Sequence, residues 1–366
     1  MDMLAAIADW RTVLGDSSVL LDEAAHQLYG ADTSGIQRQI PAALQIQNAS
    51  LLPHVMQISQ RHKVAVYPIS TGHNWGYGTS LPVTDGCVIL DLSKLQKIIH
   101  FDPEFGVVTV EPGVTQGMLS NFLTAGNHPF LVPVTGAGPH CSLVGNALER
   151  GYGLTPNTDH FGAVTDLEAV LADGSIYRTA MREAAGEDLA RLFKNGIGPY
   201  SAGLFSQGGF GIVTRMSIVL ARRPESIRVC FFGLKDDALL EVATERVRSI
   251  LAALPGVVGG LNLMNRHRIL AMSAPYPFDR IGSDGLIPES VVHELGKQYQ
   301  VMPWTGFGTL YGTHRVVLAA QKEIKRALTG VASRLVFMTP RRVQLLSKIA
   351  HLVPGAAGDR LSKTIG

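Results

Sequence analysis

The spacing of apolar positions along the chain changes repeatedly between helical and strand-like periods. Apolar residues that recur every three or four positions predict helices over residues 3–15, Leu51–His62, 115–125, Asp237–Leu254 and His314–Leu328, and a basic helical segment at the end of the chain. Asn48 or Ser50 has a side-chain oxygen that suits the cap of the second of these helices. Helices are therefore expected in both halves of the chain.

Short apolar runs between Gly, Pro, Asp and Asn residues predict strands. These runs lie at residues 41–47, 64–69, 87–90, 107–110, 166–171, 176–179, 212–220, 229–234 and 333–338. The turn Ala172-Asp173-Gly174-Ser175 predicts a hairpin between two of them. Residues 16–40, 131–160 and 255–315 have no clear period and are expected to be largely irregular. Long irregular stretches are uncommon in compact domains, so residues 131–160, rich in Gly and Pro, are expected to be functional.

Length and composition indicate about two compact domains of the α/β or α+β class. The chain has 366 residues, of which 46% are hydrophobic, 17% are charged and 39 are glycines. Arg222-Arg223-Pro224 follows a predicted strand and marks the expected boundary between the domains. The net charge of +2 gives no broad positive field, so nucleic acid is not expected as a partner.

The three cysteines, Cys87, Cys141 and Cys230, are odd in number and lack metal-ligand spacing. Their pattern favours a reducing, cytoplasmic location, and no metal site is expected. The N-terminus has acidic residues and no basic region before its apolar residues, so it does not resemble a signal peptide. No apolar run reaches the length of a membrane span, and no membrane association is expected.

A glycine-rich loop, Ser70–Gly78, lies between two predicted strands. Its glycines allow tight turns and a close approach of the backbone to a ligand, and successive amides with the Ser70 and Thr71 hydroxyls can bind a diphosphate. An ordinary turn between strands is the alternative. The loop is neither a Walker loop, since no Gly-Lys-Ser/Thr follows, nor a GxGxxG motif that opens a helix.

Four segments, taken together and in order, resemble a known family. They are Pro68–Gly78 (PISTGHNWGYG), Val110–Val114 (VEPGV), Val144–His160 (VGNALERGYGLTPNTDH) and Gly198–Thr214 (GPYSAGLFSQGGFGIVT). The chain, over about residues 40–340, resembles the FAD-dependent oxidoreductases of the vanillyl-alcohol oxidase and p-cresol methylhydroxylase superfamily. The GNALERGYG and GLFSQ motifs look most similar to its 4-alkylphenol-oxidising branch.

The resemblance implies FAD as the cofactor and an α+β fold. It implies a PCMH-type FAD-binding domain of two subdomains over residues 1–223, and an incomplete α+β substrate-binding cap domain over residues 224–366. Members of the family continue well beyond the position of Thr339-Pro340, so the chain is expected to be truncated relative to them.

The resemblance also implies a set of cofactor-binding residues. In relatives the glycine-rich loop wraps the diphosphate, the next two segments lie along the cofactor, and the pair Ile212-Val213 lies near the adenine. The implied residues are Ser70, Thr71, Gly72, His73, Asn74, Trp75, Gly76, Gly78, Pro112, Gly113, Gly145, Asn146, Gly153, Asp159, Ile212 and Val213.

Three residues of the four segments carry candidate chemistry: His73, Tyr77 and Asp159. Gly72-His73 is similar to the pair whose histidine is bonded to the flavin 8α-methyl in other branches; the alternative is a histidine that only forms hydrogen bonds. Tyr77 matches the tyrosine that binds the phenolate oxygen of the substrate in phenol-oxidising relatives. Asp159 matches an acidic residue beside the reactive flavin nitrogen. His160 either supports Asp159 or is a buried, hydrogen-bonded histidine, which is the commoner role. Tyr77 and Asp159 are thus the expected catalytic residues.

The expected function is transfer of hydride to FAD from a 4-hydroxybenzylic alcohol, a 4-alkylphenol or a similar substrate. Two alternatives stay open: a histidyl-FAD oxidase of another alcohol, sugar or amine, and a non-catalytic flavin-binding subunit. The expected electron acceptor is oxygen or a redox protein, and a homodimer is a possible assembly. A set of cap residues, for each of which a structural role is the simpler interpretation, are candidates for the pocket lining: Asn265, Arg266, His267, Trp304 and Tyr311.

Overall fold

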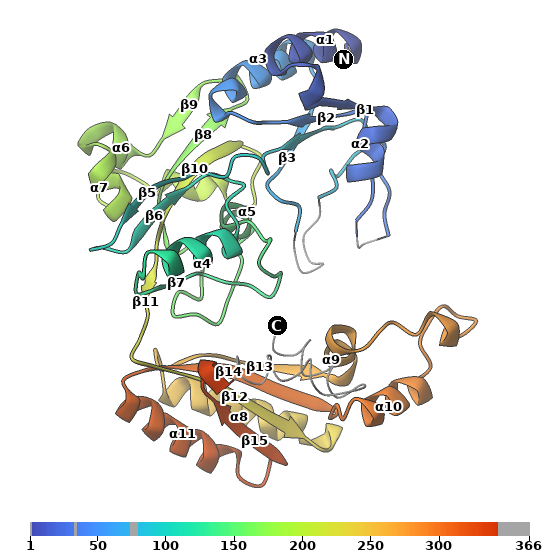
Figure 1. The fold of residues 1–366 in the computed structure, drawn as a ribbon, viewed down its shortest axis with the longest axis vertical. Coiled ribbons are helices and arrows are strands. Elements are labelled where there is room, and N and C mark those ends of the chain that lie inside the picture. Colours follow the sequence, from blue (N-terminus) through green and yellow to red (C-terminus); the bar gives the residue numbers. More distant parts are fainter. Residues whose placement is uncertain (1, 33–34, 74–79, 343–366) are drawn as a thin grey trace. The chain divides into compact units, whose positions relative to one another are not determined.

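The computed structural model describes residues 2–32, 35–73 and 80–342. The chain forms two compact units, Met1–Arg223 and Pro224–Gly366 (Figure 1). The first unit contains two sheets with their own cores, and the second contains one sheet with its helices.

The first sheet has the strand order β1-β2-β4-β3. Its strands are β1 (Val19–Leu21), β2 (Ala42–Gln45), β4 (Val88–Asp91) and β3 (Val66–Ile69). Strands β2 and β3 both pair with β4 in parallel, whereas β1 pairs with β2 antiparallel. Every residue of β4 is buried, as expected for a parallel strand covered on both faces.

Helices cover both faces of this sheet (Figure 1). Helices α1 (Met3–Leu14) and α3 (Leu52–His62) share a core with Leu44 and Leu90 of the strands. The alternate strand residues Ala43 and Ile89 pack with Ala25 of α2 (Asp22–Tyr29). The buried Trp10 of α1 donates a hydrogen bond from Nε1 to the Val55 carbonyl of α3 at 3.1 Å, so its polar atom is satisfied within the core.

The second sheet is antiparallel, with the strand order β5-β6-β10-β8-β9. These strands are β5 (Ile98–Asp102), β6 (Val107–Val110), β10 (Gly211–Val219), β8 (Val164–Leu171) and β9 (Ile176–Arg178). Two short strands, β7 (Phe130–Leu131) and β11 (Ala221–Arg222), pair with each other in a separate antiparallel sheet.

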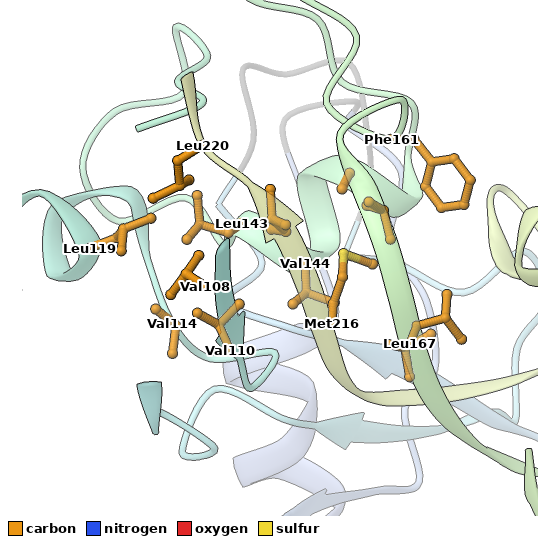
Figure 2. Packing of buried hydrophobic residues seen from close by; sticks show 14 of the residues in the cluster. Val108, Val110, Val114, Leu119, Leu143, Val144, Phe161, Leu167, Met216 and Leu220 are labelled. Carbon is orange, nitrogen blue, oxygen red and sulfur yellow. The ribbon is translucent and has the colours of Figure 1, made fainter. Parts of the chain in front are cut away.

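Helices α4 (Gln116–Ala125) and α5 (Leu143–Leu148) complete the core of the second sheet. Figure 2 shows Leu143 and Val144 of α5 among side chains from strands β6, β8 and β10. Both residues are at most 3% exposed. The packing fixes α5 against the sheet, and α5 carries one of the segments identified in the sequence.

A network of arginines and carboxylates holds helices α6 (Ala180–Ala185) and α7 (Glu187–Leu192) on this sheet. Arg182 Nε donates to the fully buried Asp166 carboxylate of β8 at 3.0 Å, and Thr179 Oγ1 donates to the same carboxylate at 2.6 Å. Arg215 Nη2 donates to Glu168 at 2.8 Å. Each of these buried charges therefore has an opposite charge or a hydrogen bond beside it.

The second unit is built on an antiparallel sheet with the order β13-β14-β12-β15. Its strands are β13 (Val258–Asn265), β14 (Trp304–Gly312), β12 (Ser226–Leu234) and β15 (Arg334–Met338). Helices α8 (Leu240–Ala253) and α11 (His314–Leu328) pack on the face formed by Cys230, Phe232 and Leu310. Helices α9 (Arg266–Ser273) and α10 (Glu289–Gln298) form a smaller cluster.

Three predictions of irregular structure were wrong. Residues 16–40 contain β1 and α2, residues 131–160 contain α5, and residues 255–315 contain β13, α9, α10 and β14. The expected helices before residue 342 and the hairpin of β8 and β9 are present. The basic helical segment expected at the end of the chain lies mostly outside the described residues. Among the residues that the structure describes, no helix is long and apolar enough to cross a bilayer.

Candidate cofactor-binding site

The glycine-rich loop starts at the carboxyl end of parallel strand β3. Ile69, the last residue of β3, is paired with Asp91, the last residue of β4. The Asp91 carboxylate accepts hydrogen bonds from Tyr29 Oη at 2.7 Å and from the Ser93 backbone at 2.8 Å. Burial is the main reason that the pKa of Tyr29 rises to about 12, so this phenol stays a donor. These hydrogen bonds hold the carboxyl ends of β3 and β4 in place at the point where the loop begins.

Of the loop itself, the structure describes the residues up to His73. Gly72 has a φ of +68°, a left-handed conformation that favours glycine. The other loop residues of the predicted site lie outside the described residues: Asn74, Trp75, Gly76, Tyr77 and Gly78.

Thr71 provides a direct test of whether the loop suits a phosphate-bearing ligand. Its Oγ1 atom is buried, and it has no hydrogen-bond partner among the described residues. A buried hydroxyl without a partner costs free energy, and a phosphate oxygen would satisfy it. The residue therefore fits the diphosphate of a dinucleotide.

Gly145 brings helix α5 into contact with the start of this loop. A Cβ atom built on Gly145 would lie 2.3 Å from Ser70 Oγ, which is closer than any real side chain is found. Only glycine lets the backbone of α5 approach the loop this closely. The first and third segments identified in the sequence therefore meet at Ser70 and Gly145.

Ser142, which the sequence analysis did not select, links the second segment to the third. Its Oγ atom caps α5 by accepting from the Gly145 backbone at 2.9 Å, and donates to the Pro112 carbonyl at 2.6 Å. Gly113 packs against another turn, since a Cβ there would lie 2.4 Å from the Ser93 carbonyl oxygen. A serine directly before a short apolar run is a capping signal that could have indicated this residue.

The fourth segment joins the third beyond the end of α5. The Gln207 backbone donates to the Leu148 carbonyl at 2.9 Å, and Arg150 Nε donates to Ser206 Oγ at 3.0 Å. Arg150 and Gln207 have φ values of +57° and +50°, which are uncommon for residues other than glycine. The segments recognised in the sequence are thus contiguous in the first unit.

His160 is buried and is bound to Asn146, not to Asp159. Its Nδ1 atom forms a hydrogen bond with Asn146 Oδ1, and its side chain lies against Gly153, where a Cβ would be 2.8 Å from Nε2. His160 is 2% exposed, and burial lowers its pKa to about 4. The imidazole is therefore neutral near pH 7, and of the two roles considered for it the structure has the buried, hydrogen-bonded histidine.

Asp159, the predicted acid or base, is exposed and anchored by one oxygen. Its Oδ1 atom accepts from the Gly162 backbone at 2.9 Å, and its backbone forms a bridge with Tyr152. The pKa of the nearby Tyr200 is raised, mainly by burial. The positive charge of Arg150 lowers this pKa, and the negative charge of Asp159 raises it. Asp159 therefore keeps one carboxylate oxygen available for a ligand.

His73 is exposed and lies beside a second histidine. The ring centroids of His73 and His140 are 5.9 Å apart, with the planes at 45°. His140 was not selected from the sequence, where only its place in residues 131–160 pointed to it.

Ile212 and Val213, at the start of β10, are buried with exposures of 3% and 4%, so their side chains belong to the protein cores.

The residues singled out in the second unit have structural contacts. Asn265 Oδ1 caps α9 by accepting from the Arg268 backbone at 2.9 Å, and Trp304 Nε1 donates to Asp237 at 2.5 Å. Tyr311 is buried, and burial raises its pKa. Arg266 and His267 belong to the first turn of α9. These contacts agree with the simpler interpretation given to this set of residues.

Comparison with known proteins gives a consistent family. Residues 41–180 match the FAD binding domain family. The chain is 32% identical over 362 residues to 1'-carboxy-chondrochloren decarboxylase of Chondromyces crocatus, covering 98% of this chain and 66% of that protein. It is 31% identical over 318 residues to the 4-cresol dehydrogenase [hydroxylating] flavoprotein subunit of Pseudomonas putida, covering 85% of this chain and 60% of that protein. The chain thus spans less than two thirds of the length of both relatives.

Solved structures agree with this result. The crystal structure of p-cresol methylhydroxylase with substrate bound matches 98% of this chain and 71% of its own chain, with a TM-score of 0.83 and 28% identity. The fold is also that of 4-ethylphenol oxidase from Gulosibacter chungangensis, with a TM-score of 0.82, 22% identity and the same coverage. The α+β fold with its FAD-binding and cap parts is confirmed, and the chain belongs to the vanillyl-alcohol oxidase and p-cresol methylhydroxylase superfamily, whose cofactor is FAD.

Proposed function

We propose that this chain carries the flavin-binding part of an oxidoreductase that removes hydride from the benzylic carbon of a 4-alkylphenol or a 4-hydroxybenzylic alcohol. The observation that carries the proposal is the likeness to p-cresol methylhydroxylase, which extends over 98% of this chain at 28% identity. The name of the Pseudomonas putida relative, a 4-cresol dehydrogenase flavoprotein subunit, supports the same substrate class.

The cofactor would lie along the contiguous segments of the first unit. Thr71 Oγ1 would donate to a phosphate oxygen, and the exposed backbone at Gly72 would approach the same group. The contacts around Gly113, Gly145 and Gly153 leave no room for side chains, so they shape the wall along which the cofactor would run. Bound FAD supplies the acceptor for the hydride of the substrate.

Two residues would act on protons at the reacting centre. Tyr77 Oη would donate to the phenolate oxygen of the substrate, which favours the ionised phenol and so promotes hydride release from the benzylic carbon. Asp159 would hold or move a proton with the carboxylate oxygen that Gly162 does not bind, because its exposed side chain faces solvent.

We propose His73 as the residue that bonds FAD covalently. Its exposed ring, in the Gly72-His73 pair, is accessible to a ligand in the loop. The new bond would join an imidazole nitrogen to the 8α carbon in place of one N–H and one C–H bond. The two protons and two electrons released would pass through the flavin to dioxygen, which is reduced to hydrogen peroxide.

One observation favours a second substrate class. The identity of 32% over 98% of this chain to a carboxy-chondrochloren decarboxylase supports a substrate that bears a carboxylate, which would leave as carbon dioxide.

The electron acceptor would be dioxygen or a redox protein, which fits the description of the Pseudomonas putida relative as a subunit. A homodimer and a cytoplasmic location belong to the same proposal.

Anaerobic mixing of the purified flavoprotein with single substrates tests the proposal. Loss of the flavin absorbance near 450 nm is expected with about equimolar 4-alkylphenols or 4-hydroxybenzyl alcohols. Benzyl alcohol, which lacks the 4-hydroxyl group, is the matched control and should leave the absorbance unchanged. Bleaching by sugars or amines alone would contradict the substrate class, and bleaching by carboxylated phenols alone would favour the decarboxylase alternative. Admission of oxygen then separates an oxidase, which recovers its colour, from a dehydrogenase.

A further inference from the structure

The buried His160 connects helix α5 with the later part of the third segment, Val144–His160. Its backbone N–H donates to the Gly151 carbonyl at 3.2 Å, and its ring contacts Asn146 on α5. The Asn146 side chain in turn covers Gly151, where a Cβ would lie 2.2 Å from Asn146 Nδ2. His160, Asn146 and Gly151 therefore form one packed group.

The contact between these side chains fixes the tautomer of the histidine. Asn146 Oδ1 is an acceptor, so the Nδ1 atom of His160 carries the hydrogen. Nε2 then has no hydrogen, is buried without a partner among the described residues, and lies against Gly153. A rotated Asn146 amide would need the other tautomer, which places a hydrogen on the buried Nε2 without an acceptor among the described residues, and this is unfavourable.

Asn146 follows the residue that contacts the glycine-rich loop. Gly145 packs on Ser70 Oγ, and the next residue in the loop is Thr71, with its unsatisfied hydroxyl. With Oδ1 bound to His160, Asn146 has Nδ2 left as a donor. The histidine thus determines which polar group of Asn146 stays available to a ligand.

We propose that His160 is a positioning residue of the flavin site: it holds the Asn146 amide in the one orientation that lets Nδ2 donate to the bound cofactor. This inference rests on the proposed cofactor position at Asn146. It gives His160 a function in flavin binding that acts through Asn146 and needs no contact between the imidazole and the flavin.

Two conservative variants separate positioning from general packing. Asparagine places its amide nitrogen close to the position of Nδ1, whereas glutamine places it close to Nε2. His160→Asn should keep flavin affinity within about threefold of wild type, and His160→Gln and His160→Leu should each lose about tenfold, which corresponds to ~1.4 kcal/mol. Fluorescence titration of the flavin-free protein with FAD measures the affinity. Where FAD is covalently bound, the midpoint potential and the absorbance maxima of the holoprotein are measured in place of the affinity.

A double-mutant cycle provides the decisive result. In an Asn146→Ala background, His160→Gln should cause no further loss beyond about twofold, because the residue through which it acts is gone. An equal loss in both backgrounds, or a loss in His160→Asn as large as in His160→Gln, would overturn the proposal. Ile218→Val in the same core is the control for general destabilisation and should leave FAD affinity unchanged. No substrate enters this test, so its outcome is independent of whether 4-alkylphenols prove to be substrates.

Discussion

Gly145 of helix α5 lies directly against Ser70, so closely that a Cβ atom on Gly145 would be 2.3 Å from Ser70 Oγ. Residues 75 positions apart in the chain therefore share one small volume at the start of the glycine-rich loop. The Ser70 hydroxyl can keep its position only while residue 145 has no Cβ atom.

Gly145→Ala should displace the Ser70 side chain. Because Ser70 Oγ must leave its position to accept the methyl group, FAD affinity is expected to fall by about tenfold. Fluorescence titration with FAD measures this change. Gly209→Ala is the matched control, since nothing lies within 4 Å of a Cβ at Gly209, and it should bind FAD as the wild type does.

Thr71→Val replaces a buried hydroxyl by a methyl group of the same shape. In the flavin-free protein the free energy of unfolding should stay the same or rise slightly, because an unsatisfied polar atom is removed. FAD affinity should fall by about tenfold, since a hydrogen bond to a charged phosphate is lost. Denaturant unfolding with and without FAD checks both statements, and a parallel fall in both quantities would show that Thr71 has a structural role alone.

Acid should destabilise the first unit through His160. Its pKa is about 4 in the folded protein and 6.5 as a free side chain, so the unfolded chain binds the proton first as the pH falls. Stability is therefore unaffected above pH ~7 and declines between pH ~6.5 and ~4, by about 3 kcal/mol in total.

Urea unfolding of wild type and His160→Asn at a series of pH values isolates this contribution. The difference in the free energy of unfolding between wild type and variant should be constant above neutrality. As the pH falls toward 4, the wild type should lose stability relative to the variant. The pKa values of Glu168 and Glu187 are also lowered, but these carboxylates titrate in both proteins and cancel from the difference. A constant difference at all pH values would contradict the prediction.

Arg182→Met should be severely destabilising. Removal of the guanidinium leaves the fully buried Asp166 carboxylate without its charged partner, at an expected cost of about 3–5 kcal/mol. Arg248→Met is the control, because its pair with Glu245 is exposed and screened by solvent, so its loss should change stability little. Thermal unfolding of both variants provides the comparison, and equal shifts would show that Asp166 is satisfied by other groups.

His73→Ala tests the proposed covalent bond. Acid precipitation of the wild-type flavoprotein should leave the yellow colour in the pellet, and the variant should release it to the supernatant. His140→Ala, at the neighbouring histidine, should keep the colour in the pellet. Colour retained in the His73→Ala pellet would assign the attachment to another residue.

The elements with strong apolar periods were predictable from the sequence, and those rich in glycine were not. Strands β13 and β14, read as loop, contain the sequences VGGLNLMN and WTGFGTLYG. Their glycines make room for aromatic neighbours: a Cβ on Gly306 would be 2.1 Å from the Phe232 ring. The local sequence does not indicate such a contact between a glycine and an aromatic ring on the neighbouring strand. The ring that fills the space beside the glycine comes from a residue far away in the sequence.

Helix α2 was missed for a different reason. Its sequence, DEAAHQLY, buries only Ala25, and Leu28 on the same helix is 62% exposed. So narrow an apolar face produces no clear helical period.

In the candidate site, the motifs identified the correct segments, but not the contacts between them. A buried, hydrogen-bonded His160 was the favoured interpretation, but the sequence could not name its partner, Asn146, which lies 14 positions earlier.

Arg150 and Gln207, where the third and fourth segments join, hold backbone conformations that suit glycine better. Each costs about 1 kcal/mol relative to an unstrained residue, and the contacts of Arg150 with Ser206 and of Gln207 with the carbonyl groups of Leu148 and Glu149 offset this cost. Glycine at either position would relieve the backbone cost but lose the side-chain contact. The join between the third and fourth segments therefore depends on two opposing terms of similar size, so relief of the backbone cost alone does not make it more stable.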